Sequence, residues 1–423
     1  MNERRVLFLS YDALTDPLGG SQILPYVTRL AALGHRITVL SLEKRAASSA
    51  ERIQVRDQCA AAGVIWRPLV YREQVPIVSA VLNLVALRRQ ARAVLNETPH
   101  DIVHCRSYLA AIVGLQMKSR FGVRFLFDMR GFWAEERLEG GGWDRPPFGV
   151  VFRYFKRRER DFFREANAIV SLTQAARDQM AARPDGERPL GPVAVIPCCV
   201  DFNHFVLASA TQREQTRDEL GISTDATVVG YLGSLGGNYM LDEMLRMFVA
   251  VRNRRPGARL LMVTRSPPAE ILVAALAHDI SAEELVIRTA TRDEVPQLIS
   301  AADIGMAFKR SSFSALACSP TKLGEMLALG IPMVVNAGVG DVEVVARDND
   351  ATIIVDRFDE DALAEAAKAI LAGKCERSAI RAGARRWFEL GDGVAAYDAI
   401  YRMLPAVGTI GSASQERRVA DGA

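Results

Sequence analysis

The sequence contains little histidine and has no strong excess of charge of either sign. Only 5 of its 423 residues are histidine, and its formal net charge is +3. So small a charge gives no electrostatic reason to expect a nucleic acid as partner. No uncharged apolar run approaches the roughly 18 residues that a membrane-spanning helix needs, and the N-terminus lacks the pattern of a signal peptide. We therefore expect a cytoplasmic protein.

The six cysteines form no CxxC pair, and no cysteine–histidine cluster has the spacing of a zinc site. We expect reduced, mostly buried thiols, as in a reducing compartment. The polar turn at residues 348–350 has the sequence Asp-Asn-Asp, a pattern that some enzymes use to bind a metal ion. Because it lies in an unsuitable context, we predict neither a metal ion nor a cofactor.

Short apolar runs alternate with longer helical patterns along most of the chain. The first half has such runs at residues 6–10, 37–41, 102–105, 124–128, 168–172 and 193–196. The second half has them at residues 228–233, 259–263, 285–287, 304–308, 332–335 and 352–355. Continuous apolar runs are typical of buried parallel strands. The alternation predicts two doubly wound, Rossmann-like α/β domains.

The predicted domain boundaries follow from these runs and from the segments between them. We expect an N-terminal domain at 1–197, a linker region at 198–224, a C-terminal domain at 225–390, a final helix at 391–406 that returns toward the N-terminal domain, and a disordered tail at 407–423. Open α/β sheets bind ligands beyond the carboxyl ends of their strands. Two such edges that face each other predict a ligand site in the cleft between the domains.

Glycine turns follow the first strand of each predicted domain. Gly19, Gly20 and Ser21 come before the first long helical pattern, and Gly233 and Ser234 follow the first strand of the second domain. Glycine lets backbone N–H groups approach a ligand, and the start of a helix favours an anion. An ordinary tight turn is the alternative at both places. Neither turn is the GxGxxG fingerprint of dinucleotide-binding proteins.

The segment 318–335 carries the most informative pattern. Ser319 or Thr321 can cap a helix whose first turn holds Lys322, which predicts an anion site with a cation beside it. One turn later, the carboxylate of Glu325 can accept hydrogen bonds from two vicinal hydroxyls, such as those of a ribose. We favour this interpretation over a capped helix with a solvated glutamate. A further glycine loop follows the next strand, at Gly338, Val339 and Gly340.

Six segments together resemble the large family of retaining GT-B glycosyltransferases that make bacterial polysaccharides and lipid-linked glycans. They are residues 19–21, 101–106, 128–136, 196–201, 230–233 and 319–325, and the resemblance extends from residue 6 to about residue 403. It implies a metal-independent hexosyltransferase in polysaccharide biosynthesis. The expected donor is a nucleotide-diphosphate sugar and the expected acceptor a glycan or a lipid-linked glycan, with retention at the anomeric carbon.

The resemblance also implies roles for individual residues. Glu325 matches the second of two paired glutamates and holds the donor ribose, while the first glutamate is replaced by Ala317. The usual arginine and lysine of the second domain's phosphate site are replaced by Ser234 and Tyr239. Candidates for the missing positive charge are Arg265, Lys309 and Lys322. The complete predicted donor site is Gly19, Gly20, Ser21, Gly233, Ser234, Arg265, Lys309, Ser319, Thr321, Lys322, Leu323, Glu325, Gly338, Val339 and Gly340.

The predicted catalytic residues are Asp128, Arg130 and Lys322. Lys322 stabilises the charge of the leaving diphosphate. Asp128 and Arg130 follow a strand and orient the acceptor hydroxyl, with Asp128 assisting its deprotonation. The predicted acceptor-side residues are Arg106, Trp133 and Glu135. The alternatives are a salt-bridge cluster for the charged residues and local core for the tryptophan.

A basic and aromatic helical pattern at residues 152–163 suggests peripheral contact with an anionic membrane, although ordinary packing of an amphipathic helix is the favoured interpretation. Two other functions remain open. One is a nucleotide-sugar epimerase on the same fold. The other is a non-catalytic nucleotide-sugar-binding subunit, which the replacements at Ala317, Ser234 and Tyr239 would suit.

Overall fold

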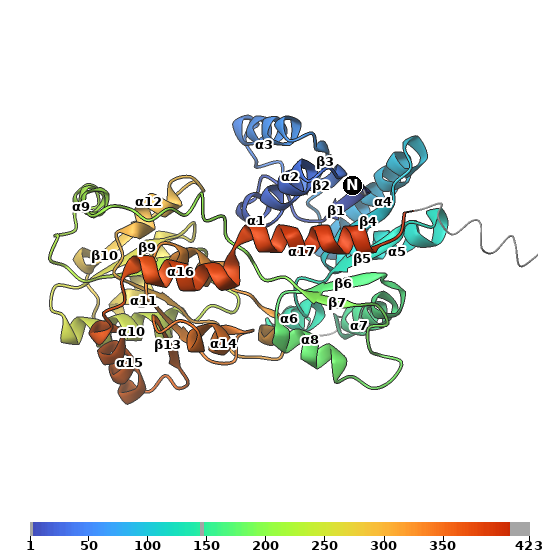
Figure 1. Ribbon diagram of the computed structural model, residues 1–423. Helices are drawn as coiled ribbons and strands as arrows, with labels where there is room; N and C mark the ends of the chain where they lie inside the picture. The colour runs from blue at the N-terminus through green and yellow to red at the C-terminus, as the bar shows by residue number, and fades with distance from the viewer. Residues whose placement is uncertain (1–2, 144–147, 407–423) are drawn as a thin grey trace, which may run out of the picture.

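The computed structural model describes residues 3–143 and 148–406. The predicted tail at 407–423 lies outside these residues. Two α/β domains lie side by side, and a long helix near the C-terminus extends from one toward the other (Figure 1). Within the described residues, no helix is long and apolar enough to cross a membrane.

The first domain contains seven strands. Its elements are β1 (Arg5–Ser10), α1 (Pro17–Gln22), α2 (Leu24–Ala32), β2 (Arg36–Glu43), α3 (Ser49–Ala61), β3 (Ile65–Val70), α4 (Pro76–Glu97), β4 (Ile102–Arg106), α5 (Ser107–Phe121), β5 (Arg124–Asp128), α6 (Trp133–Glu139), α7 (Phe148–Glu165), β6 (Ala168–Ser171), α8 (Gln174–Ala181) and β7 (Val193–Val195).

The second domain contains six strands and is followed by two helices that end the described chain. Its elements are α9 (Ala210–Glu219), β8 (Val228–Leu232), α10 (Leu241–Arg254), β9 (Arg259–Val263), α11 (Pro268–Leu276), β10 (Leu285–Arg288), α12 (Val295–Ser300), β11 (Ile304–Ala307), α13 (Thr321–Ala328), β12 (Met333–Asn336), α14 (Val342–Arg347), β13 (Thr352–Val355), α15 (Glu360–Ala372), α16 (Arg377–Phe388) and α17 (Leu390–Met403), with 3-10 turns at Ala282–Glu284 and Ser314–Ala317.

Both sheets have the same doubly wound topology. The orders are β3-β2-β1-β4-β5-β6-β7 and β10-β9-β8-β11-β12-β13. The strand order reverses between β1 and β4 in the first sheet and between β8 and β11 in the second. Ligands of open α/β sheets bind beyond the carboxyl ends of the strands at such a reversal. The segments after these four strands are therefore placed to form a site between the domains.

Two details of the first domain differ from the prediction. Strand β3 was not predicted, because its residues are partly exposed and include Pro68, which is typical of an edge strand. The first helix begins at Pro17, so Gly19 and Gly20 lie inside α1 and do not open a helix. The chain then bends at Ile23, and α2 follows.

The linker is shorter than the predicted 198–224. Phe202 and Phe205 are buried in the core of the second domain. The guanidinium groups of Arg213 and Arg217 in α9 both pair with Asp303, at 2.8 and 2.7 Å. Most of this region therefore belongs to the second domain.

The chain passes between the domains twice, and the two passages lie side by side. The N–H of Val200 donates to the carbonyl of Phe388 at 2.7 Å, and the N–H of Leu390 donates to the carbonyl of Val200 at 3.1 Å. Helix α16 therefore ends on the second domain and α17 crosses to the first, where it lies along α2 (Figure 1). The side chains of His35 and Asp398 meet there at 2.7 Å.

Candidate active site

Direct contacts hold the two domains together along one side of the cleft. The hydroxyl of Thr173 donates to the carbonyl of Leu316 at 2.6 Å. The N–H of Gln174 donates to the carboxylate of Asp341 at 2.7 Å. Such contacts between facing loops describe a closed arrangement of the domains.

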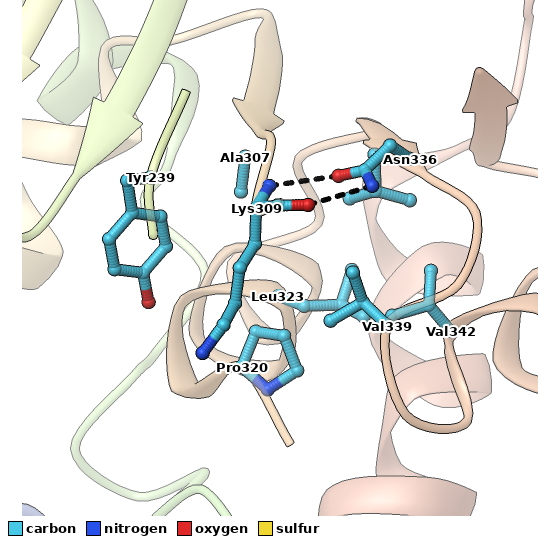
Figure 2. A pocket seen from close by; sticks show the side chains of 9 residues that line it. Tyr239, Ala307, Lys309, Pro320, Leu323, Asn336, Val339 and Val342 are labelled. Atoms are coloured by element: carbon cyan, nitrogen blue, oxygen red, sulfur yellow. Dashed lines mark hydrogen bonds between the residues drawn. The ribbon is translucent and has the colours of Figure 1, made fainter. Parts of the chain in front are cut away.

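A cavity of about 180 Å³ lies between the domains beside the start of α13. Both domains contribute to its lining, which consists of Leu172, Thr173, Gln174, Val195, Pro197, Cys318, Ser319, Pro320, Leu323, Asp341, Val342, Val345, Trp387 and Phe388. Two predicted donor-site residues, Ser319 and Leu323, are among them. A smaller cavity lies deeper in the second domain, between β11, β12 and α13 (Figure 2).

The start of α13 is not capped as predicted. Pro320 occupies the capping position, Thr321 is the first helical residue, and within the described residues no side chain caps the helix. The hydroxyl of Ser319 instead accepts a hydrogen bond from the N–H of Cys198 at 3.1 Å, which ties it to the passage between the domains. The first N–H groups of α13 therefore keep the capacity to bind an anion.

Lys322 lies in the first turn of α13 and is buried among aromatic side chains. Its ammonium nitrogen is 2.8 Å from the Tyr231 hydroxyl and 3.4 Å from the centre of the Tyr239 ring. A methyl group built on Gly233 would lie 3.2 Å from the same nitrogen, so Lys322 reaches the glycine turn after β8. Burial lowers the pKa of Lys322 to about 7.

Glu325 lies near the cation of Arg292, a residue that was not among the predicted site residues. Burial raises the pKa of Glu325, while the charges of Arg292 and Lys322 oppose that rise. Arg292 lies in the loop after β10, and its side chain reaches across to the first domain, where a methyl group built on Gly20 would lie 3.8 Å from its Cδ. Its place just beyond the carboxyl end of a predicted strand was the signal that could have identified it.

The glycines of α1 have different surroundings. A methyl group on Gly19 would lie only 2.0 Å from the carbonyl oxygen of Ala13, so tight packing requires glycine there. Gly20, in contrast, faces Arg292 across the cleft. The Ser21 hydroxyl is turned toward its own helix, 3.4 Å from the carbonyl of Leu18.

Lys309 and Arg265 are less well placed than Lys322. The Lys309 ammonium nitrogen lies 3.3 Å from the sulfur of Cys318 and 3.9 Å from a carboxylate oxygen of Glu136. Its backbone is held by the Asn336 side chain, as Figure 2 shows. Arg265 is exposed at the end of β9. Of the three predicted cations, Lys322 is the one that touches the glycine turn.

The loop of Gly338, Val339 and Gly340 packs against the segment before α13. A methyl group on Gly340 would collide with the carbonyl oxygen of Cys318 at 2.1 Å, and Gly338 and Gly340 both have positive φ, at 77° and 52°. The N–H of Gly338 already donates to Glu343 at 2.7 Å. This loop therefore shapes the approach to α13. In the turn after β8, the carbonyl of Ser234 accepts a hydrogen bond from the Tyr231 hydroxyl.

A buried ionic cluster lies at the carboxyl ends of β4 and β5, covered by α17. Arg106, Asp128 and Arg130 all belong to it, and His104 joins it with Nε2 at 3.6 Å from an Asp128 carboxylate oxygen. The other ring nitrogen of His104 lies 2.7 Å from the Tyr401 hydroxyl of α17. Burial raises the pKa of Asp128, but the neighbouring arginines and His104 outweigh that effect and lower it overall. Asp128 is therefore an ionised carboxylate. It is almost fully buried here and does not face an open cleft as predicted.

Backbone strain and unpaired atoms accompany this cluster. Ser107 and Arg130 have positive φ, at 66° and 58°, which is uncommon for residues other than glycine. Within the described part of the chain, His104 Nε2, Arg106 Nε and Asp128 Oδ1 are buried without a hydrogen-bond partner. Buried polar atoms of this kind are rare and usually have a functional or solvent partner.

Glu135 and Trp133 are placed differently from the prediction. Glu135 points toward α7, where it pairs with Lys156. The Trp133 ring packs edge-on against Trp143 and Phe155, at 5.1 and 4.8 Å between ring centres. Both therefore belong to the packing around α6 and α7 in this arrangement, and neither is placed as an acceptor-side residue.

The fold and the site define a class of protein, the two-domain GT-B proteins, whose ligands bind between two Rossmann-like domains. Comparison with family models agrees in both halves of the chain. A glycosyl transferase 4-like domain matches residues 19–199, and a model described as glycosyl transferases group 1 matches residues 226–373. The chain therefore belongs to the group 1 glycosyltransferase family.

Curated relatives are named as glycosyltransferases too. The D-inositol 3-phosphate glycosyltransferase of Salinispora tropica is 26% identical over 312 residues, which is 70% of this chain. The chain spans about 62% of that relative's length. The protein of the same name from Xylanimonas cellulosilytica is 25% identical over 384 residues, or 88% of each chain.

Solved structures share the whole architecture. Anabaena Alr3699/HepE in complex with UDP and glucose has a TM-score of 0.69 and 13% identity, over 95% of this chain and 100% of that one. WaaG, a glycosyltransferase involved in lipopolysaccharide biosynthesis, has a TM-score of 0.64 and 15% identity, over 95% and 100% of the chains. At such low identity these likenesses establish the fold and not the substrate.

Proposed function

We propose that this protein transfers a sugar from a nucleotide-diphosphate sugar to a glycan or lipid-linked acceptor, without a metal ion and with retention at the anomeric carbon. The observation that carries the proposal is the grouping of Lys322, Glu325 and Arg292 at the start of α13, opposite Gly20 of the first domain. Family membership supplies the reaction class. The Anabaena structure is a member of the same fold that binds UDP.

Each group has a chemical task in this proposal. The N–H groups of α13 and the cation of Lys322 stabilise the charge that develops on the diphosphate as the glycosidic bond breaks. Glu325 accepts hydrogen bonds from the ribose hydroxyls, and the charge of Arg292 favours the ionised form of that carboxylate. With these groups in place, the leaving group is stabilised by the protein alone.

Asp128 is the proposed base for the acceptor hydroxyl. Its carboxylate is ionised because of Arg130, His104 and Arg106, and its Oδ1 has no hydrogen-bond partner among the described residues. An acceptor hydroxyl is a suitable partner for that atom. Since Asp128 is buried here, access requires the domains or α17 to move.

The test is a thermal-shift screen with UDP-, GDP- and ADP-sugars, with and without magnesium. A ligand that binds the native state raises the melting temperature. We expect one nucleotide family to do so equally without magnesium, and Glu325→Ala to abolish the shift. Glu365→Ala, at an exposed position of α15 away from these groups, is the control. A protein that no nucleotide sugar stabilises would contradict the proposal and favour a non-catalytic subunit.

Product analysis separates transfer from epimerisation. The fold is shared by a putative UDP-N-acetylglucosamine 2-epimerase from Listeria monocytogenes, with a TM-score of 0.59. A transferase releases the nucleoside diphosphate only when an acceptor is glycosylated, whereas an epimerase yields an isomeric sugar without an acceptor. Detection of a free epimer would therefore overturn the proposal.

Peripheral membrane contact is proposed for α4, and segment 152–163 keeps the favoured interpretation of ordinary packing. The aromatic residues Phe155, Phe162 and Phe163 of α7 are buried, so they pack within the domain. On α4, Ile77, Val81 and Val85 recur every four residues and are about half exposed. Three arginines follow along the same side, namely Arg88, Arg89 and Arg92. Exposed apolar and basic side chains on one helix face suit an anionic bilayer surface.

Vesicle co-sedimentation tests this contact. We expect binding to vesicles that contain an anionic phospholipid, weaker binding at high salt, and loss of binding in Val81→Asp. Val273→Asp is the control, because Val273 is similarly exposed but lies on α11 of the other domain. Equal binding of both variants would contradict a role for α4.

A further inference from the structure

Lys322 is buried beside two aromatic rings, and although ring faces attract a cation, burial opposes the charge. Its ammonium nitrogen contacts the Tyr231 hydroxyl and the faces of the Tyr231 and Tyr239 rings, at 4.4 and 3.4 Å from their centres. No salt bridge to Lys322 exists within the described residues. A charge buried without a counter-ion is strongly unfavourable, and such a group is driven to its neutral form.

The charged and titratable neighbours of Lys322 do not change this conclusion. Glu325 on the same helix and Cys318 before it favour the charged amine, but burial raises the pKa of each, and Glu325 forms no salt bridge with Lys322 among the described residues. Lys309 repels a second cation. Burial also raises the pKa of Tyr231 and Tyr239 far above neutrality, so neither ring becomes an anion.

The position of Lys322 nevertheless suits a phosphate. It lies beside Gly233, at the glycine turn after β8, and next to the uncapped start of α13. At this turn the family pattern has basic residues where this chain has Ser234 and Tyr239. The Tyr239 ring now packs against the Lys322 ammonium nitrogen, so a lysine from another element reaches the place of the missing cation.

We propose that, above neutral pH, Lys322 is uncharged while the donor site is empty and takes up one proton from solvent when the diphosphate of a nucleotide sugar binds. The incoming anion supplies the counter-ion that the empty site lacks, and the protonated amine then stabilises the leaving diphosphate. The two tyrosines hold the amine in place in both states. This inference rests on the proposed function, because it needs a diphosphate ligand.

The inference predicts that donor binding is linked to pH. Because Lys322 has a pKa of about 7 in the empty site, it must gain a proton to bind above that pH. Affinity should then fall by up to about tenfold for each pH unit above 7. A nucleotide sugar is a suitable probe because its diphosphate, esterified at both ends, exchanges no proton near neutral pH.

Isothermal titration calorimetry measures the proton directly. The probe is whichever of UDP-glucose, UDP-N-acetylglucosamine or GDP-mannose stabilises the protein most, titrated at about pH 8 in two buffers of different ionisation enthalpy. We expect the wild-type protein to take up close to one proton per ligand. Lys322→Arg, which is always charged, should bind without proton uptake and with a flat pH profile.

A second pair of variants tests the same inference in case Lys322→Arg does not fold. In Lys322→Met combined with Tyr239→Lys, the cation returns to the position usual in the family, and binding should recover relative to Lys322→Met alone. Lys368→Met, an exposed lysine of α15, is the control and should keep the wild-type proton uptake.

The outcomes separate the two proposals. If none of these nucleotide sugars binds the wild-type protein at any pH, the proposed function fails. If one binds without proton uptake, and with the same pH dependence in the wild-type protein and in Lys322→Arg, the inference about Lys322 is overturned and the proposed function stands.

Discussion

At the scale of single residues, Lys322 illustrates a functional group that lowers stability. Its pKa in the folded protein, about 7, lies below the ordinary value of 10.5. Between these values the unfolded chain binds more protons than the folded protein. The free-energy cost of burying the Lys322 amine is therefore full below pH 7 and vanishes as the pH rises toward 10.5. Lys322→Met should therefore stabilise the protein by about 1–4 kcal/mol near pH 7.

Thermal melts across pH check this prediction. The gain in melting temperature of Lys322→Met over wild type should shrink between about pH 7 and about pH 10. Lys368→Met, at an exposed site, should show no such trend. A gain in melting temperature that is independent of pH would show that burial does not lower the pKa of Lys322.

Two adjacent glycines of α1 give a second prediction. Gly19→Ala should destabilise the protein by about 1–3 kcal/mol, because the added methyl group would overlap the carbonyl of Ala13. Gly20→Ala should leave stability unchanged or slightly raised, since its nearest neighbour is a flexible arginine side chain 3.8 Å away. Denaturant titration of the pair measures the difference. Equal effects would contradict the packing described for Gly19.

At the scale of elements, the start of α8 is completed by the other domain. The carboxylate of Asp341 accepts the N–H groups of Gln174 and Ala175, at 2.7 and 3.1 Å. A carboxylate at a helix start satisfies N–H groups that lack helical partners. The closed arrangement of the domains therefore contributes to the stability of this helix.

Removing that carboxylate should loosen the closed arrangement. Asp341→Ala should lower stability by about 1 kcal/mol, as other losses of helix caps do, and should speed hydrogen exchange at Gln174 and Ala175. Asp350→Ala, on an exposed turn nearby, is the control. Unchanged exchange at both amides would indicate that the contact contributes nothing to closure.

Elements also differed in how well the sequence predicted them. The twelve strands other than β3 were found because each contains a continuous apolar run. Strand β3 was missed because an edge strand alternates exposed and half-buried residues and tolerates Pro68. The boundary of the linker was misplaced because the short apolar contacts of Phe202 and Phe205 have no periodicity to mark them.

At the scale of the whole molecule, the last helix completes the core of the first domain. Tyr401 of α17 is fully buried, and its hydroxyl meets the ring of His104, a residue 297 positions earlier. Tyr401→Ala should therefore cost about 3–5 kcal/mol, and should lower the melting transition of the first domain. Tyr154→Ala, at an exposed position of α7, should change stability by less than about 0.5 kcal/mol. Similar melting temperatures for the two variants would contradict the docking of α17.

The sequence by itself determined the two Rossmann-like domains, the glycine turn after β8 and the helix that carries Glu325, because apolar runs and turn glycines are local features with local physical causes. Tertiary structure decided which charges meet. Arg292 joins Glu325, and Lys322 rather than Arg265 reaches Gly233, because loops from different strands converge at one cleft. Burial likewise depends on distant chain segments. Asp128, for example, is buried beneath α17, which is distant in sequence, and no local pattern could predict that burial.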